Sequence, residues 1–289
     1  MAVTARSRDI RGVTLTDAWR SFRTAIGLGW AVESNWSDPF LFGTYTIAKP
    51  LAAALILVVM FQVITGGQSQ EFLQYLIVGS ALWNLVFGVL NGLVLGILED
   101  RERYRMMKYV VVTPASLFPF LLGRSTARVL ISFIAVGVTL LVGVAFLGIE
   151  LRPSLLIVPA TLLGMVAIIG LGIVMAGWCL QLRQEAWSYP EAIAGSLYLV
   201  SGAVFPIDIL PTFIQPLAYA FPTTWWLEAS RRGLLGHGAP GAMAGLSDAA
   251  VFAALVVTTA ILAPLAYLAF TWFIRRARQA GLLDMVTGS

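Results

Sequence analysis

The chain has 289 residues, of which 58% are hydrophobic and only 12% are charged, with a net charge of +4 and a mean hydropathy of +0.84. Soluble domains carry roughly 25% charged residues, so the composition leaves too little polar surface for a water-soluble protein and predicts an integral membrane protein. The excess of positive charge is typical of cytoplasmic loops in such proteins and does not indicate a nucleic-acid partner.

The counts of a few residue types exclude several kinds of chemistry. One Cys and one His allow no internal disulfide and no metal cage of His and Cys ligands. A P-loop needs Lys followed by Ser or Thr, but Lys49 precedes Pro50 and Lys108 precedes Tyr109. The chain itself is therefore expected to hold no catalytic site, no metal ion and no nucleotide cofactor.

Residues 1–43 are mixed polar and precede the first strongly apolar segment. An amphipathic helix within them is predicted by five apolar residues that recur at spacings of three and four: Leu15, Trp19, Phe22, Ile26 and Trp30. Such a helix either lies in the membrane interface or packs on the spans of its own chain, and we favour the interface.

Six apolar segments follow, each close to the roughly 20 residues that a membrane-spanning helix needs. They are placed at 44–64, 72–98, 123–148, 154–182, 189–205 and 248–274. Together they predict an all-α polytopic membrane protein with a six-helix transmembrane domain over 44–274 and a tail over 275–289. Between the last two spans, 206–247 is apolar but interrupted by prolines, which predicts short re-entrant helices that are buried against protein on the outer side.

The distribution of basic residues predicts the orientation of these spans. With the N-terminus inside, 16 of the 19 Lys and Arg residues fall in cytoplasmic pieces, and only Arg152, Arg231 and Arg232 fall outside. Because positively charged loops stay in the cytoplasm, both termini are predicted to be cytoplasmic.

The predicted spans hold almost no ionisable residues away from their ends, which argues against a proton- or sodium-driven carrier. A ridge of Gly88, Gly92 and Gly96 on the second span allows close helix packing, either within the chain or between two copies. Aromatic and amide residues on the same span either line a substrate path or bond to a neighbouring helix: Trp83, Asn84, Phe87 and Asn91.

A charged run continues the second span and is either a solvated loop that fixes topology or a helix that docks on a partner. It comprises Glu99, Asp100, Arg101, Glu102, Arg103, Tyr104, Arg105, Met106 and Met107. Pro114 is expected to end it. On the outer side, Glu228 with Arg231 and Arg232 has the spacing of ion pairs on one short helix, which predicts a structural role.

These stretches resemble a known family, the type-2 ABC exporter permeases. The charged run, followed by Leu122-Gly123-Arg124, resembles the cytosolic coupling element of that family. The stretches 201–206 (Ser-Gly-Ala-Val-Phe-Pro) and 221–233, which begins Phe-Pro-Thr-Thr-Trp-Trp, resemble its fifth-span exit and its re-entrant external helices. With the amphipathic N-terminal helix and the six spans, the resemblance covers essentially the whole chain.

The resemblance implies a permease subunit of the bacterial cytoplasmic membrane that works as a dimer with a second permease copy. A separate ABC ATPase subunit, which carries the ATP and Mg²⁺, would bind the charged run. The second and fifth spans of two copies would enclose a path for a hydrophobic or amphipathic substrate such as a drug, a natural product or a lipid-linked glycan. The fifth span would contribute Ser196, Tyr198 and Ser201 to the path. Two other functions stay open at this point: a non-transporting membrane scaffold and a membrane-embedded enzyme that modifies lipids.

Overall fold

The computed structural model describes residues 15–34, 38–65, 70–112, 117–182, 186–238, 241 and 243–282. Within these ranges the regular structure is helical and contains no strand, which confirms the predicted all-α class for the described part of the chain. Pro114, which was expected to end the charged run, lies outside the described residues, as do 1–14 and 283–289 of the predicted N-terminus and tail.

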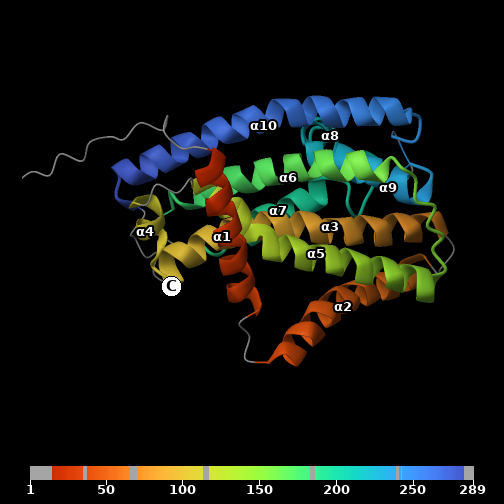
Figure 1. Cartoon of the computed structure of the whole chain (residues 1–289). Helices are drawn as coiled ribbons and strands as arrows, with labels where there is room; N and C mark the ends of the chain where they lie inside the picture. The colour runs from red at the N-terminus through yellow and green to blue at the C-terminus, as the bar shows by residue number, and fades with distance from the viewer. Residues whose placement is uncertain are drawn as a thin grey trace, which may run out of the picture.

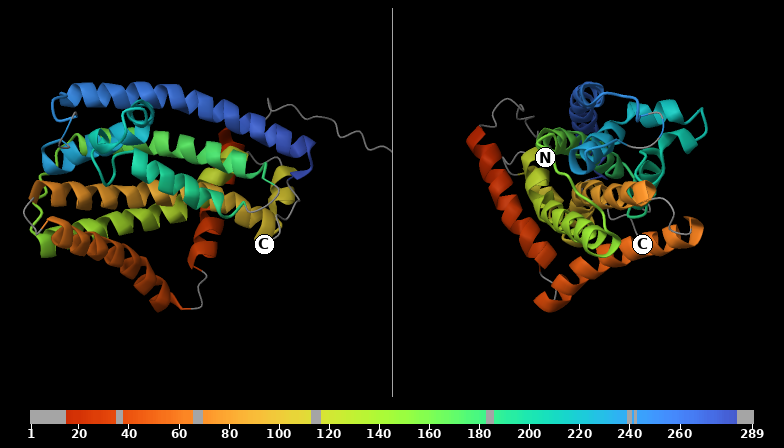
Figure 2. Two further views of the ribbon diagram at one scale, coloured as in Figure 1. Left: turned by 180° about the vertical axis from the view of Figure 1, so that it is seen from behind. Right: turned by 90° about the vertical axis from the view of Figure 1, so that its right-hand side faces the viewer.

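Five long helices are each long and apolar enough to cross a membrane. They are α2 (Pro39–Thr65), α3 (Gln70–Leu98), α5 (Leu117–Leu147), α6 (Ile157–Cys179) and α10 (Asp248–Gln279). Helices pair their backbone N–H and C=O groups internally, as a lipid environment requires. Four of them run alongside one another, and α2 diverges from them toward its N-terminus (Figures 1 and 2). The chain is therefore a multi-pass membrane protein.

The predicted fifth span, 189–205, is helical only in its first part. The helix α7 (Tyr189–Val200) has 12 residues, which gives a length of about 18 Å and is too short to cross a hydrocarbon core of about 30 Å. Gly202 adopts φ 73°, the left-handed conformation that commonly ends a helix. In the described residues five helices rather than six therefore have the length of a span.

The proline-interrupted stretch after α7 forms short helices, as its sequence predicts. They are η3 (Ile207–Ile209), α8 (Gln215–Ala220) and α9 (Pro222–Leu235). Trp226 of α9 is fully buried and fits against Gly164 of α6, where an added Cβ would lie 1.9 Å from the indole ring. The close approach of α9 to α6 therefore depends on a glycine.

The helix α3 is the centre of the bundle. In its most apolar stretch 78% of residues are buried, against 22% in α5 and in α10. Its glycine ridge faces α5 of the same chain: a Cβ on Gly88 would lie 1.5 Å from Ser132 Oγ, and one on Gly92 would lie 3.2 Å from Arg128 Cβ. Of the two roles left open for this ridge, the structure places it in packing within the chain.

The helix α1 (Leu15–Ser34) lies across one end of the bundle (Figure 1), which we call the α1 end; α9 lies toward the opposite end, the α9 end. Small residues bring α1 against α5, because Cβ atoms on Gly29 and Gly123 would each come within 2.5 Å of a backbone oxygen of the other helix. Of the predicted apolar face, Leu15, Trp19 and Trp30 stay exposed. The fully buried positions of α1 are the small residues Ala25 and Gly29, whereas Phe22 and Ile26 are half-buried.

Candidate functional site

The charged run begins with a change of helix type at the α1 end. After Leu98 the chain forms a single π-helical turn, η2 (Glu99–Arg103), and then the short helix α4 (Met107–Val112). The Tyr104 N–H donates to the Glu99 carbonyl at 2.9 Å, and Arg105 adopts φ 51°. π-helical turns inside longer helices are rare and occur mainly at functional sites.

The first half of this turn enters a buried ion network with α5 and α1. Arg124 donates to Glu99 at 2.9 Å and to Asp100 at 3.4 Å. Arg128 donates to Glu99 at 2.7 Å and lies 2.6 Å from a carboxylate oxygen of Glu33 on α1. Buried charges are tolerated when they are paired in this way. The network therefore joins α1, η2 and α5 into one unit.

The electrostatic environment of Glu33 reflects its position at the edge of this network. Burial raises the pKa of the Glu33 carboxyl, and Glu99 acts in the same direction. The Arg128 guanidinium opposes both effects, but the net pKa stays above its ordinary value. Arg124 also lowers the pKa of Glu33, so burial outweighs the effect of both arginines.

The second half of the turn points to the connection between α6 and α7. Arg101 donates to the carbonyl oxygen of Leu180 at 3.3 Å and pairs with Glu102. The indole N–H of Trp187 donates to the same Glu102 carboxylate at 2.7 Å. Glu99 and Asp100 thus contact α5, whereas Arg101 and Glu102 contact the connection between α6 and α7.

The structure divides the nine predicted coupling residues by exposure. Glu99, Asp100, Arg101 and Met107 are buried, Glu102 and Met106 are half-buried, and Arg103, Tyr104 and Arg105 are exposed. We name the last three, together with Tyr109 of α4, the exposed coupling surface; Tyr109 is 66% exposed. Among the described side chains of this segment, this group is the most open to direct contact with a partner, whereas the buried residues hold the segment on the bundle.

The predicted path residues take part in contacts within the chain, some between helices and some within one helix. Trp83 of α3 and Tyr198 of α7 have ring centroids 5.0 Å apart. Asn84 donates to Thr139 of α5 at 3.4 Å, and Asn91 donates to the Phe87 carbonyl at 3.1 Å. The remaining two lie on or after α7, where Ser196 is exposed and Ser201 is buried.

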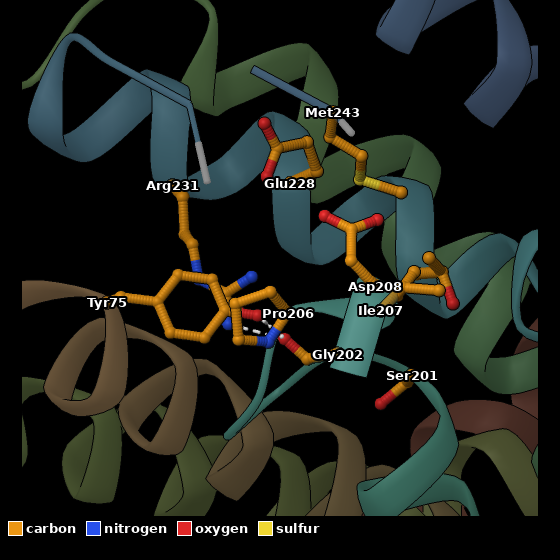
Figure 3. Close-up of a pocket in the computed structure, with 10 residues that line it drawn as sticks. Tyr75, Ser201, Gly202, Pro206, Ile207, Asp208, Glu228, Arg231 and Met243 are labelled. Atoms are coloured by element: carbon orange, nitrogen blue, oxygen red, sulfur yellow. Dashed lines mark hydrogen bonds between the residues drawn. The ribbon is translucent and has the colours of Figure 1, made fainter. Parts of the chain in front are cut away.

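At the α9 end, Arg231 holds the chain where α7 ends (Figure 3). Its guanidinium donates to the carbonyl oxygens of Gly202 and Ala203, both at 2.8 Å. It also lies 3.8 Å from the ring centroid of Tyr75 on α3, whose hydroxyl donates to Gly202 as well. Irregular backbone inside a membrane protein is tolerated where protein satisfies its polar groups, and Arg231 with Tyr75 does so here.

The neighbouring Arg232 points to other partners. It donates to Glu228 at 2.8 Å, to Asp248 at 2.9 Å, and to the carbonyl oxygens of Met243 at 2.7 Å and Leu246 at 2.6 Å. Burial lowers the pKa of Arg232, but the hydrogen bonds of Glu228 and Asp248 outweigh it and the net pKa is raised. Of the predicted trio, Arg232 makes the ion pair with Glu228, whereas Arg231 bonds to backbone carbonyls.

A cleft of about 280 Å³, its open mouth included, lies beside Arg231. Glu228, Asp208 and Ser201 line it together with Tyr75 (Figure 3). Among the described residues no group of three or more His, Cys, Asp and Glu side chains could hold a metal ion. The cleft therefore presents mixed charges rather than a set of metal ligands.

Sequence reasoning missed several residues that connect these elements. Arg124 and Arg128 lie near the start of the predicted third span, and their four-residue spacing places both on one helix face, which could have suggested a shared partner. Glu33, Tyr75 and Trp187 carry no local signal, because their contacts join helices that are far apart in the sequence.

Comparison with known proteins places the chain in a family. Residues 28–235 match the family described as ABC-2 type transporter. This match covers α2 to α9, the C-terminal third of α1, and both the η2 turn and the Arg231 contacts. No curated protein sequence matches the chain significantly. The chain therefore belongs to the ABC-2 type transporter family, whose members are the membrane subunits of ABC transporters.

Proposed function

We propose that the chain is the permease subunit of an ABC exporter, which moves a hydrophobic or amphipathic substrate outward by alternating access. It works with a second permease copy in the bacterial cytoplasmic membrane and keeps both termini in the cytoplasm. A separate ATPase subunit binds the ATP and Mg²⁺ and supplies the energy. The family match supports a transport subunit, and the basic residues that flank the α1 end support the orientation.

The observation that carries this proposal is the exposed coupling surface at the end of a buried ion network. Arg103, Tyr104 and Arg105 are exposed and belong to the same segment as Glu99 and Asp100, which pair with Arg124 of α5. Arg128 of α5 links Glu99 onward to α1. A load applied to the exposed residues is therefore transmitted to two further helices through paired, buried charges. A free, solvated loop would have no such connection.

The coupling assignment predicts that charge on this surface controls binding of the ATPase. The double variant Arg103→Glu/Arg105→Glu is expected to reduce co-purification of the co-expressed ATPase by about 10- to 100-fold, because reversed charges at an interface cost several kcal/mol. The measurement is the affinity of the detergent-solubilised subunits for each other, together with the ATPase activity of the reconstituted complex.

The matched control is Arg275→Glu/Arg278→Glu, which makes the same charge change at exposed positions near the end of α10. We expect it to alter ATPase binding less than threefold, since single exposed charges contribute about 0–1 kcal/mol. If both double variants bind the ATPase as the wild type does, the exposed coupling surface is not where the ATPase binds.

A further inference from the structure

We infer that Trp187 is a positioning residue that transmits movement of the η2 turn to α7. Resting on the proposed function, this inference adds a second output to the coupling segment. One output runs through Glu99 and Asp100 to α5 and α1. The other runs through Arg101 and Glu102 to Trp187, which lies two residues before α7 begins at Tyr189.

The contacts at the base of α7 are specific and charge-assisted. The Trp187 indole N–H donates to Glu102 at 2.7 Å, and hydrogen bonds to ionised groups are roughly twice as strong as neutral ones. Glu102 also pairs with Arg101, whose side chain is fully buried and donates to the Leu180 carbonyl at the end of α6. The η2 turn is therefore attached both where α6 ends and where α7 begins.

The connection between α6 and α7 is anchored on its other sides as well. Trp178 of α6 and Tyr189 of α7 meet edge to face, with ring centroids 5.4 Å apart. Gln181 donates to the Phe273 carbonyl of α10 at 2.8 Å. Leu180 and Ala186 are fully buried. These contacts tie the described part of the connection to α6, α7 and α10, so a force at Glu102 reaches α7 rather than being absorbed.

Contacts near the C-terminal end of α7 convert movement of its N-terminal end into a tilt of the whole helix. Tyr198 packs on Trp83, and the backbone just after the helix is held by Arg231 and Tyr75. With 12 residues, α7 is a short, stiff rod. Tyr198 and the backbone just after the helix contact α3 near the far end of α7, so a push at Trp187 tilts the rod about that end.

Trp187 contributes more to this attachment than ordinary core packing. Its side chain lies at the rim and the residue is 40% exposed, so the ring itself is not part of the hydrophobic core. The specific contribution is the indole N–H, which Phe lacks while it keeps an aromatic ring. Trp187→Phe therefore removes the contact to Glu102 without opening a cavity.

The test uses the full complex with its co-expressed ATPase and distances between pairs of spin labels, with and without ATP and vanadate. The only Cys, Cys179, is buried and is replaced by Ala. One label pair joins Ala192 on α7 to Leu265 on α10, and a second joins Gly27 on α1 to Leu265; all three positions are exposed. Trp272→Phe is the matched control, because Trp272 is a comparably exposed tryptophan, 53% exposed, on α10.

We expect the wild type and Trp272→Phe to change both distances when ATP and vanadate are added. Trp187→Phe should shift the population of the ATP-dependent state at the α7 pair by about tenfold, the effect of losing one hydrogen bond to a charged group. The α1 pair and ATPase binding should stay within about twofold of the wild type.

The possible outcomes separate this inference from the proposed function. An unchanged α7 response in Trp187→Phe, with a normal wild-type response, overturns the role of Trp187 and leaves the coupling function intact. Equal loss at the α1 and α7 pairs also overturns it, because Trp187 would then support the whole segment. A wild type that binds no ATPase or shows no change at either pair overturns the proposed function itself.

Discussion

Replacement of Arg124 by Ala is expected to destabilise the protein by about 3–5 kcal/mol, the cost of leaving buried charges without their partner. Arg124 is the only described residue that bonds to both Glu99 and Asp100, and its side chain is 1% exposed. In a chain of this size the change corresponds to a drop of roughly 10 °C in the midpoint of thermal unfolding. The measurement is thermal unfolding of the detergent-solubilised protein.

Arg152 provides the matched control, because it pairs with Glu150 at 3.0 Å while both side chains are more than 70% exposed. Arg152→Ala is expected to change stability by less than about 0.5 kcal/mol. Adding Glu99→Gln and Asp100→Asn to Arg124→Ala should recover at least half of the loss, since the uncompensated charges are then gone. A triple variant no more stable than Arg124→Ala would contradict the assignment of the loss to those charges.

Substitution of Gly79 by Ala is expected to cost about 1–3 kcal/mol, the usual range for overpacking. A Cβ at this position of α3 would lie 1.9 Å from the Ala203 carbonyl oxygen and 2.4 Å from the Arg231 guanidinium. Backbone cannot move aside as a flexible side chain can, so the end of α7 must shift and the hydrogen bonds of Arg231 lengthen. Thermal unfolding of the purified, detergent-solubilised protein measures this loss of stability.

Gly137 on α5 provides the matched control for Gly79→Ala. It is also helical, but a Cβ there would meet no atom within 4 Å. Gly137→Ala is therefore expected to be neutral or to stabilise the protein by up to about 1 kcal/mol, because Ala loses less backbone entropy on folding. Opposite signs for the two substitutions support close contact between α3 and the end of α7, whereas equal small effects would speak against it.

The long helices could be predicted from the sequence because length and composition decide them. The apolar segments 44–64, 72–98, 123–148, 154–182 and 248–274 all fall on helices of span length. The early end of α7 could not be read in the same way, because Ser201 to Phe205 is as apolar as the helix before it. Its path is decided by Gly202 and by Arg231, which lies 29 residues further along the chain.

The position of the charged run was predictable, but the direction of each of its side chains was not. Helical periodicity assumes 3.6 residues per turn, and the π-helical turn from Glu99 to Arg103 departs from it where α3 ends. The partners of the run are also distant in the sequence, since Arg128 joins Glu99 to Glu33 of α1. Charge composition therefore identified the segment, while tertiary contacts determine which residues remain exposed.

The two adjacent arginines of α9 have a consequence for the order of assembly during synthesis. The partners of Arg231, which are Tyr75, Gly202 and Ala203, all precede it in the chain and are already made when it leaves the ribosome. Most partners of Arg232 come after it, at Met243, Leu246 and the first residue of α10, Asp248. Because chains are completed from the N-terminus, we expect Arg231 to dock α9 first. Arg232, held until then by Glu228 alone, completes its contacts only when the last helix arrives.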